Sequence, residues 1–246
     1  MQHRSKKIKK SFFIILVVLI VLSGGSAIYL GNYYHSVDVE KYMNGSSEVS
    51  VEKFDKGWFF DGAGEEKALI FYPGAKVATE AYAPLMYQLA ESGIDCFLVD
   101  MPFHMAFFGM NRAEEIMQEY NYEAWYLGGH SLGGAMAANF AADYVEDHRG
   151  GIRGLLLLAA YSTKDLSTSD MSVVTVYGSE DGVLNIDKIV AGRELMPQDY
   201  KEVCIEGGNH AQFGSYGAQK GDGTAAIPAE EQWARTVEVF VGDESE

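Results

Sequence analysis

An apolar run that ends in glycines around a single serine constrains the fold of this chain more than any other feature. It reads Trp125-Tyr126-Leu127-Gly128-Gly129-His130-Ser131-Leu132-Gly133-Gly134 and continues into an alanine-rich segment. The pattern predicts a strand that turns sharply into a helix, with Ser131 at the turn. Gly129 and Gly133 would keep the two limbs of the turn from colliding, since glycine has no Cβ.

Such a turn exposes the serine hydroxyl and points the first backbone N–H groups of the helix at the same place. The alternative is a glycine-rich turn without chemistry, because G-x-S-x-G occurs often by chance. The strand-like run before Ser131 and the small-residue helix after it favour a nucleophile. A serine nucleophile needs a histidine to take its proton, and the histidine needs a carboxylate to orient it.

The rest of the chain alternates between apolar strand-like runs and helical patterns. Because the apolar runs are continuous, their strands are buried on both faces, which is typical of a parallel sheet covered by helices. We therefore expect an α/β fold with a mostly parallel, doubly wound sheet of about eight strands. Residues 49–54 alternate with period two, residues 57–60 follow after a short break, and together they predict an antiparallel pair at the sheet edge. The predicted strands are 67–72, 94–99, 125–128, 155–160, 173–177 and 202–205, and the predicted helices are 79–92, 113–120, 132–147, 186–194 and the segment from 228.

Residues with catalytic side chains follow the last strands, and sites in parallel sheets lie at the carboxyl ends of strands. His210 follows the last predicted strand in a glycine-rich loop, which makes it the candidate base. Asp181 follows the preceding strand and is the candidate acid. Glu180 points the other way if the turn is tight, so Asp165 and Asp170 are the fallback candidates for the acid. A hydrogen-bonded loop role is the alternative for His210.

The order Ser131, Asp181, His210, together with the G-x-S-x-G turn, resembles the α/β-hydrolase superfamily. Residues 71–77, 129–134 and 208–214 are similar to a compact, membrane-anchored bacterial branch of it. The resemblance covers about residues 49–240. It implies an α/β-hydrolase fold in which Ser131 is the nucleophile, His210 the base and Asp181 its partner.

The resemblance also implies an oxyanion hole made by the backbone N–H groups of Leu132 and Ala75, with Lys76 as the alternative to Ala75. The sequence departs from the lipase-type pattern here, since Tyr72-Pro73-Gly74 replaces the usual His-Gly-Gly run. The second oxyanion donor therefore stays open.

Cap domains in this superfamily usually follow the strand after the nucleophile helix, where only residues 161–172 are available. We therefore expect no cap and a shallow cleft walled by Met101, Phe103, Phe107 and Tyr161.

His104 is either a polar break in this aromatic loop or a group that polarises the substrate. Asp222 is either a turn residue or a cation ligand. No metal and no cofactor are expected.

The first thirty residues have the composition of a membrane-targeting segment. Residues 4–10 hold five basic side chains, and residues 12–22 are all apolar. Residues 12–30 approach the ~20 residues that span a bilayer, which favours a retained anchor with the basic end in the cytoplasm and the remainder outside. Residues 25–27 fit a cleavage site, so secretion after signal cleavage is the alternative. Residues 31–48 are predicted as a stalk and residues 49–246 as the catalytic domain.

The charge of the chain bears on its partners. The net charge is −16, and residues 31–246 hold 14 basic and 35 acidic side chains, a net charge of −21. This excess of acidic side chains argues against nucleic acid as a partner, because contacts to phosphates require basic side chains. Cys96 and Cys204 lie in apolar strand-like runs, and we expect both to be buried and unbridged.

The sequence thus predicts a serine hydrolase that acts on a small carboxylic ester through an acyl-enzyme on Ser131. A peptidase or a thioesterase would use the same atoms and remains an alternative. A non-catalytic binding module displayed on a hydrolase scaffold is an alternative of another class. Such modules typically lose the nucleophile or the histidine, and this chain has both.

Overall fold

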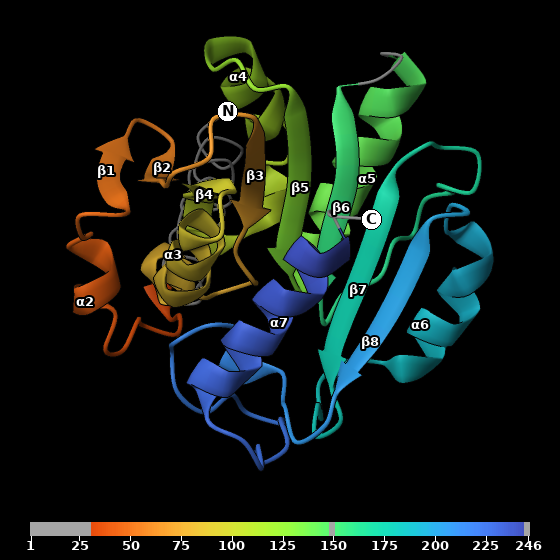
Figure 1. Cartoon of the computed structure of the whole chain (residues 1–246). Helices are drawn as coiled ribbons and strands as arrows, with labels where there is room; N and C mark the ends of the chain where they lie inside the picture. The colour runs from red at the N-terminus through yellow and green to blue at the C-terminus, as the bar shows by residue number, and fades with distance from the viewer. Residues whose placement is uncertain (1–30, 148–150, 244–246) are drawn as a thin grey trace, which may run out of the picture. The chain divides into compact units, whose positions relative to one another are not determined.

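The strands form one eight-stranded sheet in the order β1-β2-β4-β3-β5-β6-β7-β8, in a computed structural model that describes residues 31–147 and 151–243 (Figure 1). The first pairs, β1 with β2 and β2 with β4, are antiparallel, and every later pair is parallel. This confirms the mostly parallel sheet and its antiparallel edge. The strands are β1 Ser50–Phe54, β2 Gly57–Asp61, β3 Lys67–Tyr72, β4 Asp95–Val99, β5 Ala124–His130, β6 Ile152–Leu158, β7 Ser172–Gly178 and β8 Tyr200–Ile205.

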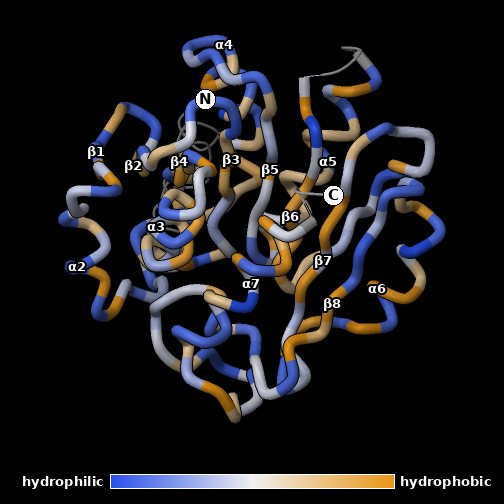
Figure 2. The backbone as a smooth tube through the Cα atoms, in the orientation of Figure 1, coloured by the Kyte–Doolittle hydropathy of each residue, from blue (hydrophilic) through white to orange (hydrophobic). Residues whose placement is uncertain are grey.

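Side chains alternate between the two faces along each buried strand, so both faces of the sheet are apolar. Helices cover both of these faces. On β3, Leu69 and Phe71 face the core beneath α3 and α7, whereas Ile70 and Tyr72 face the core beneath α4 and α5. Figure 2 shows hydrophobic residues along the central strands and a largely hydrophilic α4. The α-helices are α2 Glu40–Met43, α3 Ala83–Glu91, α4 Arg112–Glu119, α5 Leu132–Asp147, α6 Ile186–Gly192 and α7 Ala229–Asp243, and the 3-10 turns are η1 Thr79–Tyr82, η2 Pro102–His104, η3 Ala106–Phe108, η4 Arg193–Leu195 and η5 Ala211–Phe213.

The connection from β6 to β7 bears on the expected absence of a cap. Residues 159–171 contain neither a helix nor a strand, so no cap domain is inserted at this place. In Figure 1 β7 and β8 run downward, and loops lie below their carboxyl ends.

The folded unit starts before the predicted catalytic domain. The sequence predicts a stalk for residues 31–48, whereas Val39 and Tyr42 are buried in the core. The ring of Tyr42 packs edge-on against Tyr87 of α3 and Trp233 of α7. This compact unit therefore begins at Tyr34 and includes residues predicted as a stalk.

The two cysteines are unbridged, as expected, but only one is buried. Cys96 on β4 is fully buried, and Cys204 on β8 is exposed. The prediction of a buried Cys204 is wrong because β8 is an edge strand, and most of its side chains are partly or fully exposed. Four strands separate β4 from β8, which keeps the thiols apart.

The predicted membrane segment, residues 1–30, lies outside the described residues. Within residues 31–147 and 151–243, no helix combines the length and the apolar character that crossing a bilayer requires.

Candidate active site

The turn between β5 and α5 holds Ser131 in a left-handed conformation, with φ of 53°. This conformation is strained for a residue with a side chain, and such strain is concentrated at functional sites. The N–H of Ser131 donates to the carbonyl of Leu158 at 2.9 Å, which ties the turn to β6. A Cβ on Gly133 would lie 2.1 Å from the carbonyl oxygen of Tyr72, so glycine is required where the helix crosses β3.

Asp181 and His210 lie in contact at the carboxyl ends of β7 and β8. Nδ1 of His210 donates to Oδ2 of Asp181 at 2.8 Å, and both side chains are 2% exposed. The other oxygen of Asp181 accepts the N–H groups of Val183 and Leu184 at 2.8 and 2.7 Å. Both oxygens of this carboxylate are thus engaged, so that it holds the imidazole in one tautomer and one orientation.

The second ring nitrogen of His210 is available for a proton. Because Nδ1 carries the hydrogen that Asp181 accepts, Nε2 presents its lone pair. Within the described residues Nε2 is buried and has no hydrogen-bond partner. The ring of His210 packs against that of His130, with centroids 4.4 Å apart, and Ser131 follows His130 directly in the chain. A basic nitrogen and the turn serine therefore occupy the same corner of the sheet.

A buried chain of hydrogen bonds connects this corner to the loop after β3. The oxygen of Tyr82 accepts the N–H of Gly74 at 3.0 Å and lies 2.7 Å from Nδ1 of His130. The hydroxyl of Tyr82 can also donate to Nδ1 of a neutral His130, and in that tautomer the His130 hydrogen lies on Nε2. Burial, reinforced by the nearby His210 ring, lowers the pKa of His130 well below its usual range. His130 is thus a neutral residue that holds the Gly74 loop against the turn.

The predicted oxyanion donors differ in what they already bind. Leu132 is the first residue of α5, where a backbone N–H has no partner within the helix. The N–H of Lys76 donates to the carbonyl of His104 at 2.7 Å and is therefore occupied. No hydrogen bond from the N–H of Ala75 to another described residue is present. Of the two alternatives, Ala75 is the one with a backbone donor to offer.

Asp222 links the loops of the acid and the base. Its Oδ1 accepts the N–H groups of Gly182, next to Asp181, at 3.1 Å and of His210 at 3.2 Å. Its Oδ2 accepts the N–H of Ala211 at 2.8 Å. This carboxylate therefore fixes the distance between the two loops, and neither sequence interpretation, turn residue or cation ligand, describes that role.

The predicted wall residues lie in different environments. Phe103 and Phe107 are exposed at 58% and 49%, in η2 and η3. Met101 is buried in the core that includes Tyr72. Tyr161 is half-buried and lines a small cavity with Thr175 of β7, Tyr200 of β8 and residues of α6. The structure thus leaves the two phenylalanines at the surface, whereas Met101 is buried and Tyr161 lines a cavity.

Sequence reasoning missed Tyr82, His130 and the linking role of Asp222. His130 had one available signal, its place immediately before the turn serine. Tyr82 and Asp222 had none, because their partners lie on loops that only the fold brings near them. The fallback acid Asp165 is bound to Ser167 in an exposed turn instead.

The chain matches the model of a known protein family, and its fold is similar to solved structures. Residues 68–234, well over half of the chain, match the model of a family described as the alpha/beta hydrolase family. A comparison with curated proteins finds no significant match.

Three solved esterase structures share the fold at low sequence identity. An esterase of Pyrobaculum calidifontis superposes with a TM-score of 0.60 at 14% identity, over 84% of this chain and 88% of its own. Carboxyl esterase 2 of the fungus Tuber melanosporum gives 0.58 at 12%, over 84% and 91%. The esterase domain of a Rhodothermus marinus protein gives 0.57 at 12%, over 79% and 97%.

Proposed function

Because the chain belongs to the alpha/beta hydrolase family, we propose that it is a serine hydrolase that cleaves carboxylic esters through an acyl-enzyme on Ser131. The observation that carries the proposal is the pair of His210 and Asp181. The pair is joined at 2.8 Å and leaves Nε2 of His210 without a partner among the described residues, beside the turn that bears Ser131.

In the proposed reaction, Nε2 of His210 removes the proton of the Ser131 hydroxyl while the oxygen attacks the ester carbonyl. The Asp181 carboxylate stabilises the imidazolium that results. The carbonyl oxygen becomes an oxyanion, which accepts hydrogen bonds from the N–H groups of Leu132 and Ala75. The tetrahedral intermediate collapses, and the alcohol leaves with the proton from Nε2. Water, activated by the same nitrogen, then releases the acid and restores Ser131.

The preference for an ester rests on family and fold, since the solved neighbours above are esterases by name. A thioesterase or peptidase would use the same serine, base and donors. A binding module is disfavoured because the strained Ser131 turn and the oriented His210 would then have no role. The expected cofactor requirement is none, because the proposed steps use only side chains and backbone N–H groups.

We propose that the substrate is a small ester with a short acyl group. No cap domain follows β6, and the exposed Phe103 and Phe107 form low walls. Each buried methylene contributes about 0.8 kcal/mol, and only while the protein covers it. Specificity should therefore rise over the first carbons and then level off.

The location of the enzyme is a further part of the proposal. The basic and apolar residues of segment 1–30 favour a single-pass anchor, with the N-terminus in the cytoplasm and the catalytic domain outside. Fractionation of native cells followed by N-terminal sequencing tests it. A membrane-bound chain of full length supports the anchor, and a soluble chain that begins near Ile28 would show signal cleavage instead.

The activity is tested by hydrolysis of p-nitrophenyl, thioester and anilide substrates with the same acyl group. The proposal expects the ester to be turned over fastest and Ser131→Ala to lose about 10⁴-fold or more in rate. Ser92→Ala, which removes an exposed hydroxyl at the end of α3, is the matched control and should keep full activity. Equal activity in the two variants would refute the assignment of Ser131.

A further inference from the structure

Three phenylalanines at the end of β4 form an exposed aromatic patch. Phe103, Phe107 and Phe108 are 58%, 49% and 52% exposed. The ring of Phe108 lies 5.6 Å from that of Phe103 and 4.0 Å from that of Phe107, centroid to centroid. Three large aromatic rings gathered on one surface indicate a contact with another apolar phase or partner.

This aromatic patch borders the candidate active site. The carbonyl of His104, which follows Phe103, accepts the N–H of Lys76 at 2.7 Å. Lys76 follows Ala75, the proposed oxyanion donor. Phe103, His104 and Lys76 all have positive φ angles, between 54° and 58°, so the two loops are held in unusual conformations where they meet. Whatever contacts the patch also lies near the entrance of the site.

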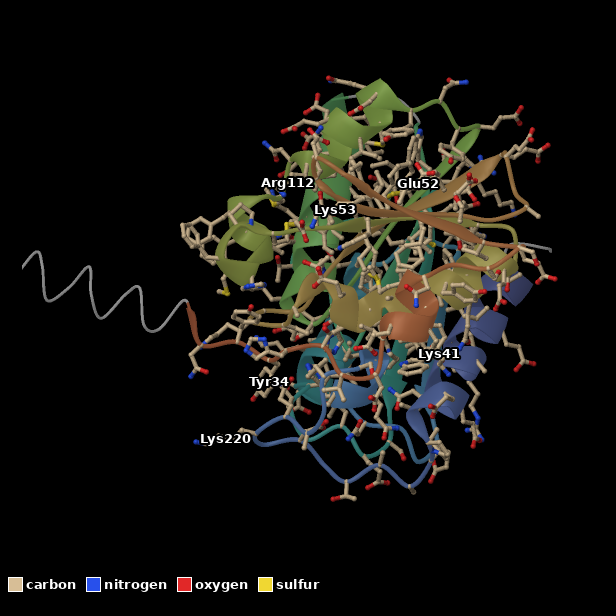
Figure 3. All side chains as sticks on the ribbon, turned by 90° about the vertical axis from the view of Figure 1, so that its left-hand side faces the viewer. Tyr34, Lys41, Glu52, Lys53, Arg112 and Lys220 are labelled. Atoms are coloured by element: carbon tan, nitrogen blue, oxygen red, sulfur yellow. The ribbon has the colours of Figure 1, made fainter. Side chains whose placement is uncertain are left out.

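The N-terminal part of the chain enters the folded unit at the same place. The N–H of Tyr34 donates to the carbonyl of Lys76 at 2.7 Å, and the N–H of Ala78 donates to the carbonyl of Tyr34 at 2.8 Å. The hydroxyl of Tyr34 accepts the N–H of Lys220 at 3.2 Å, and Figure 3 shows both residues at one edge of the molecule. Tyr34 is thus fixed between the Lys76 loop and the loop after His210.

Only residues 31–33 separate Tyr34 from the apolar segment. An extended chain covers at most about 3.6 Å per residue, so Tyr34 lies within roughly 14 Å of Leu30. If residues 12–30 span a bilayer, Tyr34 cannot leave its surface, and the loops bonded to Tyr34 stay there as well. This tether makes the lipid surface the nearest apolar phase to the aromatic patch.

We propose that the aromatic patch inserts into the headgroup region of the bilayer that anchors the chain, so that the active-site entrance faces the lipid. This inference rests on the proposed anchor and adds an orientation to the proposed function. Phenylalanine is among the side chains that bury in the boundary between headgroups and acyl chains where a protein lies on a membrane. Residues 31–246 carry a net charge of −21, so insertion of the rings, not attraction to anionic lipid, drives the contact.

Insertion is tested with the full chain reconstituted into phosphatidylcholine vesicles that contain brominated lipid, which quenches tryptophan. Phe108→Trp places a reporter in the patch, and Val190→Trp on α6, 49% exposed and far along the sheet, is the matched control. Trp58, Trp125 and Trp233 give the same background in both. The added emission should be quenched and blue-shifted for Phe108→Trp alone. Equal quenching in the two variants, or a chain that does not bind the vesicles, would overturn the proposal.

A kinetic measurement gives the second readout. Phe108→Ser removes one ring without altering a residue assigned to the site. Its rate should fall several-fold on an ester embedded in the vesicles and stay unchanged on the same acyl ester dissolved in water. An equal effect on both substrates would contradict insertion. The double variant Phe108→Trp/Ser131→Ala carries the reporter and lacks the proposed nucleophile. Its quenching measures insertion alone, so a failure of this inference can be distinguished from a failure of the proposed function.

Discussion

The imidazole rings of His130 and His210 pack with centroids 4.4 Å apart and planes tilted by 52°. His210 therefore rests on a histidine that burial keeps neutral, since the pKa of His130 lies well below its usual range. A charged His130 would repel the imidazolium that the proposed mechanism forms on His210. The packing contact thus positions the ring of His210, and the neutral His130 does not repel the positive charge that forms on it.

The buried His130 should make stability depend on pH. Below about pH 6.5 the unfolded chain binds a proton at this histidine and the folded chain does not, so the free energy of unfolding falls as the pH falls. His130→Asn should flatten this dependence between about pH 5.5 and 6.5 by up to ~1.4 kcal/mol per pH unit. Asp95, whose pKa burial raises, acts in the opposite sense at lower pH. Urea unfolding across this range measures the slope, and His35→Asn, at an exposed position, is the control. Identical slopes in all three proteins would contradict the prediction.

Tyr82→Phe should lower both stability and turnover. The substitution leaves the N–H of Gly74 and Nδ1 of His130 without their shared partner, which costs about 1–3 kcal/mol. The loop that carries Ala75 then shifts, so kcat should fall by roughly tenfold, below the about 10²–10³-fold cost of losing an oxyanion donor. KM should change little. Tyr87→Phe on α3 is the control. A normal kcat in Tyr82→Phe would show that this chain of bonds does not position Ala75.

Asp222→Asn should separate the loops of the acid and the base. The amide replaces one carboxylate oxygen by a donor, so one or more of the N–H groups of Gly182, His210 and Ala211 loses its acceptor. We expect a stability loss of about 1–3 kcal/mol and a lower kcat with nearly constant KM. Asp165→Asn changes a comparable turn carboxylate away from the site. If Asp222→Asn is less stable but keeps its kcat at a temperature where it is folded, Asp222 stabilises the loops without positioning the acid and the base.

Acyl length gives a prediction about the cleft. For dissolved p-nitrophenyl esters, kcat/KM should rise over short chains and level off within about two to eight carbons, because exposed Phe103 and Phe107 cover little more. Saturation should be hyperbolic below the micelle point of each ester. A maximum at long chains would reveal a deeper pocket than the described residues form.

The turn serine, the fold and the positions of the candidate acid and base could be predicted because each depends on local sequence. G-x-S-x-G sets a sharp turn around Ser131, and continuous apolar runs set the parallel strands whose ends hold Asp181 and His210. The structure brings the last two together at 2.8 Å.

Other features depend on contacts between distant parts of the chain and carry no local signal. Asp222 acts through the backbone of His210 and Gly182, and Tyr82 joins Gly74 to His130. The packing of Tyr42 on α3 and α7 likewise made a predicted stalk part of the folded unit. Cys204 was misassigned because an apolar run does not reveal whether its strand lies at the edge of the sheet.

The proposed function depends above all on Ser131 being a nucleophile activated by His210. Labelling of the intact chain with a fluorophosphonate, followed by peptide mapping, tests it most directly, since the reagent bonds to activated serines whatever the natural substrate is. We expect one adduct, on the peptide that contains Ser131, and loss of labelling in Ser131→Ala and in His210→Ala but not in Ser92→Ala. No adduct in the folded protein, or an adduct on another serine, would contradict it.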